Sequence, residues 1–219
     1  MDKLRESFTA ELKALEKDVL KMGEVVSEML QKAMEAFKSG KVELADRVIA
    51  MDDIVDKYNM DIETKSLQLI ALQQPVGRDL RIIATAMRVI TDIERMGDYT
   101  IDITKFAKRL MGQPKLPQAD AIPQIAEVVG KMLKETLQAF VNKDLKLVQQ
   151  MIEHDDVVDK AFIKLFDELV AEIEKNPTSA RPAIQLLMIA RYLERIADHI
   201  TNVGERVFYV ETGEIKELH

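Results

Sequence analysis

The chain contains the same acidic motif twice, and this internal repeat constrains its possible folds more than any other feature. Residues 52–57 read Asp-Asp-Ile-Val-Asp-Lys, and residues 155–160 read Asp-Asp-Val-Val-Asp-Lys, 103 positions later. A second motif, Glu-Arg-Met-Gly-Asp at 94–98, returns as Glu-Arg-Ile-Ala-Asp at 194–198, 100 positions later. Two motifs that return in the same order at nearly the same distance indicate a duplicated domain.

Apolar spacing and turn residues predict an all-α protein. From residue 8 to residue 36, apolar side chains recur at alternating spacings of four and three, which is typical of a long amphipathic helix. Ser39-Gly40 is expected to end this helix, because glycine readily adopts the left-handed cap conformation. The other helices are expected at 42–73, 78–111, 121–141, from the turn 142–144 to 175, and at 180–211.

The helix breakers of the chain are densest near its middle. Gly112-Gln113-Pro114, with Pro117 close behind, marks a domain boundary. We therefore expect a first domain at 1–112, a linker at 113–117 and a second domain at 118–219. Short loops between long helices imply antiparallel neighbours. The prediction is two tandem antiparallel three-helix bundles, with six long helices in all.

Composition argues against several classes of protein. The formal net charge of −7 disfavours nonspecific binding to nucleic acid. The absence of cysteine excludes disulfides and thiolate metal sites. No apolar run approaches the ~18 residues that a membrane span needs, and residues 1–6 have no apolar core of a signal peptide. These features are compatible with a cytoplasmic protein.

The repeated acids are spaced to share helix faces. Asp52 and Asp56 are one helical turn apart, as are Glu94 and Asp98. In an antiparallel hairpin that turns near Pro75, both helices bring their acids to a similar height. The expected site residues are Asp52, Asp56, Glu94 and Asp98 in the first half and Asp155, Asp159, Glu194 and Asp198 in the second. Possible extra ligands or hydrogen-bonding neighbours are Asp53, Asp102, Asp156 and Asn202.

Two interpretations of these acids remain open. Carboxylates that converge repel one another, so either cations or arginines must balance them. Oxygen-only ligand sets favour hard cations such as Mg²⁺, Ca²⁺, Mn²⁺ or iron. In the metal-free alternative, Arg95 and Arg195, which directly follow the two glutamates, reach neighbouring carboxylates.

The histidines and the missing motifs restrict the chemistry further. A carboxylate-bridged di-iron oxidase would carry Glu-x-x-His on its helices, and neither His154 nor His199 has a glutamate three positions before it. We expect His199 to be a surface histidine and His219 to be terminal. No glycine-rich phosphate-binding motif is present, and no serine has the sequence context of a nucleophile.

The sequence also resembles a known family over essentially its whole length. Residues 73–81, Gln-Gln-Pro-Val-Gly-Arg-Asp-Leu-Arg, together with the motif at 94–98, resemble the first repeat of the PhoU family of phosphate-uptake regulators. The segment Ala-Arg-Tyr-Leu-Glu-Arg-Ile-Ala-Asp-His-Ile-Thr-Asn at 190–202, followed by Val-Phe-Tyr-Val at 207–210, resembles the second. One departure is Ala197, where the family often has glycine.

The resemblance implies a fold, a metal and a role. It implies two three-helix bundles related by a pseudo-twofold axis. It also implies clusters of divalent or trivalent metal ions (iron, zinc, manganese or magnesium) on the eight repeated carboxylates. The implied role is that of a cytoplasmic accessory of the phosphate ABC transporter, which helps to silence a sensor histidine kinase when phosphate is plentiful. The implied partners are that kinase, the transporter ATPase and a second copy of the chain, with membrane association only through partners.

Three functions compete at this point. The leading one is a non-enzymatic adaptor. The second is a metal-dependent phosphohydrolase-type enzyme, because clustered metals activate water. The third is a metal-free helical scaffold, in which the apolar seam from Phe8 to Ala36 extends past its own bundle and supports dimerisation.

Overall fold

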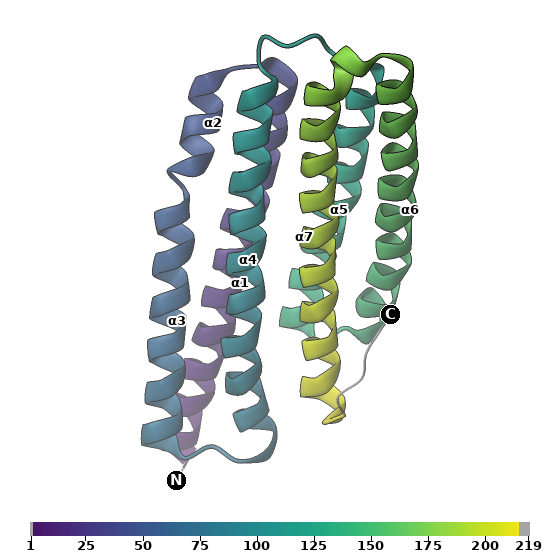
Figure 1. The fold of residues 1–219 in the computed structure, drawn as a ribbon. Coiled ribbons are helices and arrows are strands. Elements are labelled where there is room, and N and C mark those ends of the chain that lie inside the picture. The colour runs from purple at the N-terminus through teal and green to yellow at the C-terminus, as the bar shows by residue number, and fades with distance from the viewer. Residues whose placement is uncertain (1, 215–219) are drawn as a thin grey trace.

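The computed structural model describes residues 2–214, of which residues 2–4 are described by their backbone alone, and this part of the chain is helical without strands. The long helices are joined by short loops and by two 3₁₀ turns, at Pro117–Ala121 and Pro177–Ser179. Figure 1 shows them as upright rods. The α-helices are α1 (Asp2–Ser39), α2 (Val42–Ile49), α3 (Asp52–Gln73), α4 (Gly77–Leu110), α5 (Ile122–Asn142), α6 (Leu145–Lys175) and α7 (Ala180–Thr212).

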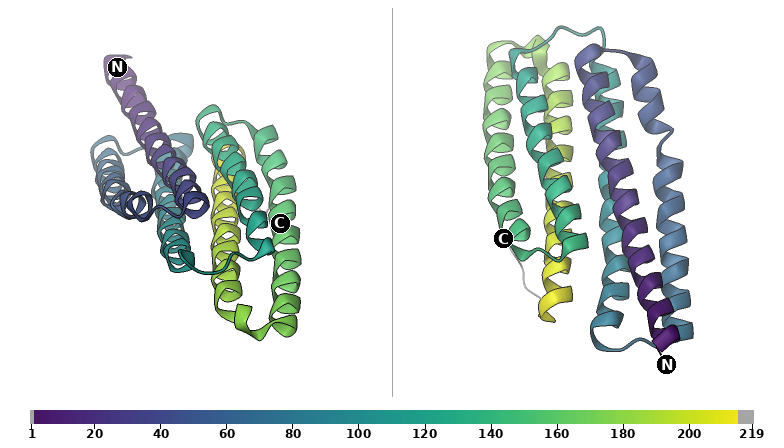
Figure 2. Two further views of the ribbon diagram at one scale, coloured as in Figure 1. Left: turned by 90° about the horizontal axis from the view of Figure 1, so that it is seen from above. Right: turned by 180° about the vertical axis from the view of Figure 1, so that it is seen from behind.

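The helices form two three-helix bundles, which confirms the predicted fold. In the first, α1 and α4 pack with the α2–α3 segment, and in the second α5, α6 and α7 pack in the same order. The most extensive contact in the molecule joins α4 to α7, and α1 also touches α5. Helices α3 and α6 therefore lie at the two outer edges of the molecule (Figure 1), and α1 and α5 lie behind α4 and α7 in that view (Figure 2). The inner helices α4 and α7 hold the halves together.

The helix expected at 42–73 is interrupted, so that part of the prediction was wrong. At the break, the amide of Met51 donates to the carbonyl of Val48 over 3.0 Å. This bond reaches back three residues, as in a 3₁₀ helix, and not four, as in an α-helix. As a result α3 begins at Asp52, and Asp52 and Asp53 lie in its first turn. Acids are favoured there because the first amides of a helix are unpaired. The equivalent Asp155 lies within the uninterrupted α6.

Turn residues end the other helices close to where the sequence predicts. Gly40 has φ +66°, and its amide donates to the carbonyl of Ala36 over 2.9 Å. Gln74, which precedes Pro75, ends α3 with φ +46°. Pro75, which has no amide hydrogen to donate, cannot continue the helix, and the chain reverses there into α4.

The apolar seam of α1 is used within the chain. The side chains from Phe8 to Ala36 that define it are buried in the common core, and Leu15, Val19 and Met22 have no exposed surface. Helix α1 packs against α3, α4 and α5. Because α5 belongs to the second bundle, the seam does extend past its own bundle, and it is buried there by helices of the same chain.

Candidate metal centres

In the first half, α3 and α4 bring the repeated acids together. Burial raises the pKa of Asp52, and the negative charges of Asp56 and Asp98 raise it further. The pKa of Glu94 is raised by burial, an effect that Arg95 opposes and that Asp98, Asp56 and Asp52 reinforce. The four carboxylates predicted from the sequence are thus close enough to repel one another.

The second half repeats this arrangement between α6 and α7. Burial raises the pKa of Asp159, and the charge of Asp198 adds to the shift. Burial also raises the pKa of Glu194, where Asp198 and Asp159 raise it further and Arg191 lowers it. Asp155 lies half-buried one helical turn before Asp159. The duplicated motif therefore crowds carboxylates in both halves, but the acid on the outer helix whose pKa is raised is Asp52 in α3 and Asp159 in α6, which are not equivalent positions of the repeat.

Arginines lie against both groups of acids. Arg95 Nη1 is 3.0 Å from Asp98 Oδ2, and Arg195 Nη1 is 3.1 Å from Asp198 Oδ2. In the second half Arg191 Nη1 also pairs with Glu194 Oε1 at 2.5 Å. The side chains of these arginines are between 43% and 54% exposed, so their ion pairs are screened and exchangeable.

The possible extra ligands have other partners or face solvent. Asp102 pairs with Lys105 at 3.1 Å, and the exposed Asp156 pairs with Lys160 at 3.4 Å. Asp53 is exposed beside Asp52. The amide of Asn202 donates to Asp92 Oδ1 over 3.3 Å, which directs it toward α4.

Two acids of the first group, Asp52 and Asp98, line a hollow of about 260 Å³ on the surface. Across residues 2–214, no three or more His, Asp or Glu side chains are arranged to hold a metal ion. The donor set nevertheless fits a hard cation, because all of the predicted ligands are carboxylates. A cation would also offset the repulsion between carboxylates that adds to the effect of burial on the pKa values of Asp52 and Glu94. The hollow is lined by Asp52, Arg95, Asp98, Tyr99, Ile101, Asp102 and Lys105.

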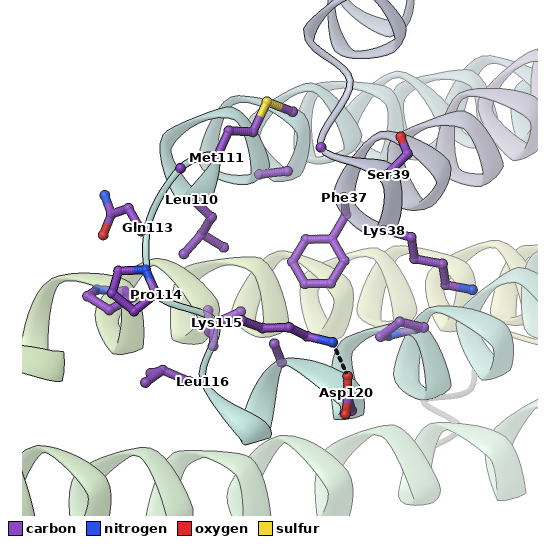
Figure 3. A pocket seen from close by; sticks show the side chains of 17 residues that line it. Phe37, Lys38, Ser39, Leu110, Met111, Gln113, Pro114, Lys115, Leu116 and Asp120 are labelled. Carbon is purple, nitrogen blue, oxygen red and sulfur yellow. Dashed lines mark ion pairs between the residues drawn. The ribbon is translucent and has the colours of Figure 1, made fainter.

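A larger cavity, of about 550 Å³, lies away from these acids, where the linker crosses between the halves. Figure 3 shows Phe37, Leu110 and Leu116 among its apolar lining, with Lys115 and Asp120 paired at 2.8 Å. None of the predicted ligands lines it. This cavity is therefore not the predicted metal site, although it is larger than the hollow beside Asp52.

Sequence analysis missed a polar contact between the halves. His199 Nδ1 lies 2.9 Å from Asp92 Oδ1, and the His199 side chain is only 18% exposed. The expectation of a surface histidine was wrong, because α4 covers this side of α7. Next to it, the rings of Tyr99 and Tyr192 stack with centroids 5.6 Å apart. A hydrogen bond with Tyr99 raises the pKa of Arg195, beside the second group of acids.

The repeat itself held the signal for these residues. At an offset of 100, Asp92 corresponds to Tyr192, and His199 corresponds to Tyr99. All four therefore stand at positions where the two copies differ. A comparison of the two copies would have included these positions, but among many others that differ.

Comparison with known proteins agrees with both the repeat and the fold. The family model described as "PhoU domain" matches residues 19–107 and again residues 122–207. The chain belongs to the PhoU family. This PhoU-family chain is 35% identical over 216 residues to a protein of Clostridium acetobutylicum, with 98% of this chain and 99% of that protein aligned. It is 38% identical over 205 residues to one of Aquifex aeolicus, covering 94% and 93% respectively. Both relatives are named "Phosphate-specific transport system accessory protein PhoU homolog".

Solved structures match this PhoU-family chain along its length. The crystal structure of PhoU from Pseudomonas aeruginosa has a TM-score of 0.90 and 29% identity, covering 94% of this chain and all (100%) of that one. The phosphate transport system regulatory protein PhoU from Streptococcus pneumoniae also has a TM-score of 0.90, with 31% identity, covering 96% and 100%. In residues 2–214, no helix has the length and apolar character required to cross a bilayer.

Proposed function

We propose that this protein is a non-enzymatic regulator of phosphate uptake and phosphate-starvation signalling. The observation that carries the proposal is its near full-length similarity to proteins named as accessory proteins of phosphate-specific transport. It acts in the cytoplasm as an adaptor between the ATPase of the phosphate ABC transporter and a sensor histidine kinase, which it silences when phosphate is plentiful. It reaches the membrane only through these partners and binds no nucleic acid.

The arrangement of the halves supports an adaptor. Two similar bundles present equivalent helix pairs, α3 with α4 and α6 with α7, on opposite sides of the α4–α7 contact (Figure 1). Equivalent helix pairs with different side chains suit two different protein partners. We also propose that the chain forms a homodimer.

Metal binding to the repeated carboxylates is part of the same proposal. The ions are iron, zinc, manganese or magnesium, held by Asp52, Asp56, Glu94 and Asp98 in the first half and by Asp155, Asp159, Glu194 and Asp198 in the second. A bound cation supplies positive charge where the carboxylates repel one another. Asp98 and Asp198 must then release their arginines, which exposed ion pairs permit at small cost.

A binding experiment tests the adaptor. The purified protein is titrated separately into the transporter ATPase and into the cytoplasmic part of the sensor kinase, with and without the metal mixture. Saturable binding to both supports the adaptor. Failure to bind either protein in both conditions contradicts it. Turnover of a phosphoester that is lost in Glu94→Gln would instead show an enzyme.

Elemental analysis tests the metal site independently. The protein is exposed to a mixture of metals, passed through gel filtration and compared with Asp56→Asn/Glu94→Gln. The control is Asp61→Asn/Glu63→Gln, which neutralises exposed acids on the same helix α3. We expect metal to remain with the wild type and the control and to be reduced in the first variant. Equal metal content in all three excludes these ligands and favours the arginine-paired scaffold.

A further inference from the structure

An arginine of α7 is held between two helices beside the second group of acids. This group consists of Asp155, Asp159, Glu194 and Asp198. Arg191 Nη1 lies 2.5 Å from Glu194 Oε1, and the guanidinium carbon of Arg191 lies 5.8 Å from the centre of the Phe162 ring on α6. A guanidinium within about 6 Å of an aromatic ring face is attracted to the ring. Arg191 therefore has one partner on each of the two helices that carry the group.

The pair between Arg191 and Glu194 is better protected from water than the other arginine pairs at these acids. The side chain of Glu194 is 13% exposed. The aspartates that pair with Arg95 and Arg195 are each 40% exposed. Solvent screening weakens an ion pair, so Arg191 holds its carboxylate more firmly than the other two arginines hold theirs. A cation that binds Glu194 through Oε1 must displace Arg191.

Arg191 acts on acids of both helices. Burial raises the pKa of Asp159 on α6 and of Glu194 on α7, and the positive charge of Arg191 opposes the rise in both. The guanidinium thus already supplies positive charge to both helices of the second group. A bound metal ion would have to supply that charge in its place.

The first half lacks both parts of this contact. At the offset of 100 Arg191 corresponds to Thr91, and at the offset of 103 Phe162 corresponds to Asn59. The Thr91 hydroxyl donates to the carbonyl of Met87 over 3.3 Å, within its own helix. The arrangement of Arg191 over its acids is therefore a property of the second half and not of the repeat.

Other charges near the two groups do not remove this difference. Arg95 and Arg195 are equivalent, and each pairs with the aspartate three residues after it. The halves also differ seven residues beyond those aspartates, where Lys105 and Glu205 are equivalent. That separation is about 10 Å along a helix, close to the screening length at physiological salt. In addition, Lys105 is paired with Asp102 at 3.1 Å, so these two charges offset each other.

We propose that the two carboxylate groups are unequal metal sites, and that Arg191 makes the second group the weaker one by occupying Glu194. The inference rests on the metal binding in the proposed function and ranks its two sites. When metal is scarce, the first half binds the cation and the second half keeps its arginine. The two bundles then present different charges to their partners although their folds are equivalent.

Manganese binding to variants with one intact group tests the ranking. Glu94→Gln/Asp98→Asn leaves only the second group intact, and Glu194→Gln/Asp198→Asn leaves only the first. Each chelator-treated protein is titrated with Mn²⁺, and the free ion is followed by its electron paramagnetic resonance signal. We expect the first group to bind Mn²⁺ at least about tenfold more tightly than the second, as a bond to a charged group is lost there. Circular dichroism establishes that each variant is helical.

Exchange of the differing residues tests the cause. In the variant that keeps the second group, Arg191→Thr should tighten Mn²⁺ binding about tenfold. Arg181→Thr is the matched control and should change the affinity little, because it removes the same charge 13 residues before Glu194, about 20 Å away along α7. In the variant that keeps the first group, Asn59→Phe/Thr91→Arg transfers the contact and should weaken binding about tenfold.

Each contrary result has its own meaning. Equal affinities of the two groups, or a tighter second group, overturn the ranking. An affinity that Arg191→Thr leaves unchanged or weakens, or that Arg181→Thr raises equally, overturns the role of Arg191. A wild type that binds no Mn²⁺ at about 1 mM, the upper range of weak cation sites, overturns the proposed metal binding together with this inference. Binding by the wild type therefore distinguishes a failure of the ranking from a failure of the metal site itself.

Discussion

His199 Nδ1 lies 2.9 Å from Asp92 Oδ1, at a position where the internal repeat would place a tyrosine pair. The corresponding residues, Tyr99 and Tyr192, stack against each other a short distance away on the same two helices. Equivalent positions of the two repeats in the α4–α7 contact are thus occupied by the polar pair His199 and Asp92 and by the stacked aromatic pair Tyr99 and Tyr192. The duplicated halves have kept their fold and diverged at the surface that joins them.

Asp92→Ala should destabilise the protein. Asp92 accepts from both His199 and Asn202, so its loss leaves two part-buried groups without this acceptor. We expect the free energy of unfolding to fall by about 1–3 kcal/mol, the cost of unpaired buried groups. Urea unfolding at pH 7 measures it. The control Asp156→Ala removes an exposed acid of α6 that pairs with the exposed Lys160, and it should change the free energy of unfolding little. Equal effects of the two substitutions would argue against this role of Asp92.

Two glycine substitutions should have opposite effects on stability. A methyl group at Gly97 would make ordinary contact with Val55 at 3.5 Å, and the second half has Ala197 at the same place. Gly97→Ala should therefore raise the free energy of unfolding by up to about 1 kcal/mol, because glycine is a poor helix former. A methyl group at Gly23 would overlap the buried Leu137. Gly23→Ala should lower the free energy by about 1–3 kcal/mol through overpacking. Denaturant unfolding of both variants checks the signs.

The raised carboxylate pKa values predict how stability depends on pH in chelator-treated protein. Burial, and then neighbouring charges, raise the pKa of Glu94 and of Asp159 above their ordinary values of 4.5 and 3.8. Between these values and the raised ones, the folded chain binds more protons than the unfolded chain. The free energy of unfolding contributed by these groups therefore falls as pH rises through that window, and their charges remain destabilising at pH 7.

Removing one of these charges should consequently stabilise the metal-free protein. We expect Glu94→Gln and Asp159→Asn to raise Tm at pH 7 by about 2 °C and to have less effect near pH 3, which is below the ordinary pKa values of both acids. Asp61→Asn, which changes an exposed acid on α3, serves as the control. Thermal melts at both pH values provide the measurement. A lower Tm in both variants at pH 7 would mean that these charges have stabilising partners.

Arginine and metal should compete for the same acids if the proposed metal site is correct. Arg95 pairs with Asp98, a proposed ligand. Arg95→Gln should therefore increase the metal retained after gel filtration, because Asp98 no longer has to release its partner. Arg88→Gln, an exposed change elsewhere on α4, provides a matched comparison. A loss of metal in Arg95→Gln alone would show that Arg95 supports the site.

The sequence by itself determined the helices, their pairing and the acids that face one another. Apolar spacing and turn residues such as Gly40 and Pro75 act locally, so they can be read without a structure. The repeat then added the second half, and Asp56 and Glu94 were placed at one level by counting residues from the turn at Pro75. The family followed from the same motifs.

Only the tertiary structure decided which helix faces are covered. It showed that the seam of α1 is enclosed by its neighbours, that His199 meets Asp92 across 107 positions of sequence, and that Phe166 stays exposed. The break before Asp52 also appeared only there. These features depend on how the two bundles pack against each other. The spacing of apolar residues within a helix shows which face is apolar, but it does not show which distant segment covers that face.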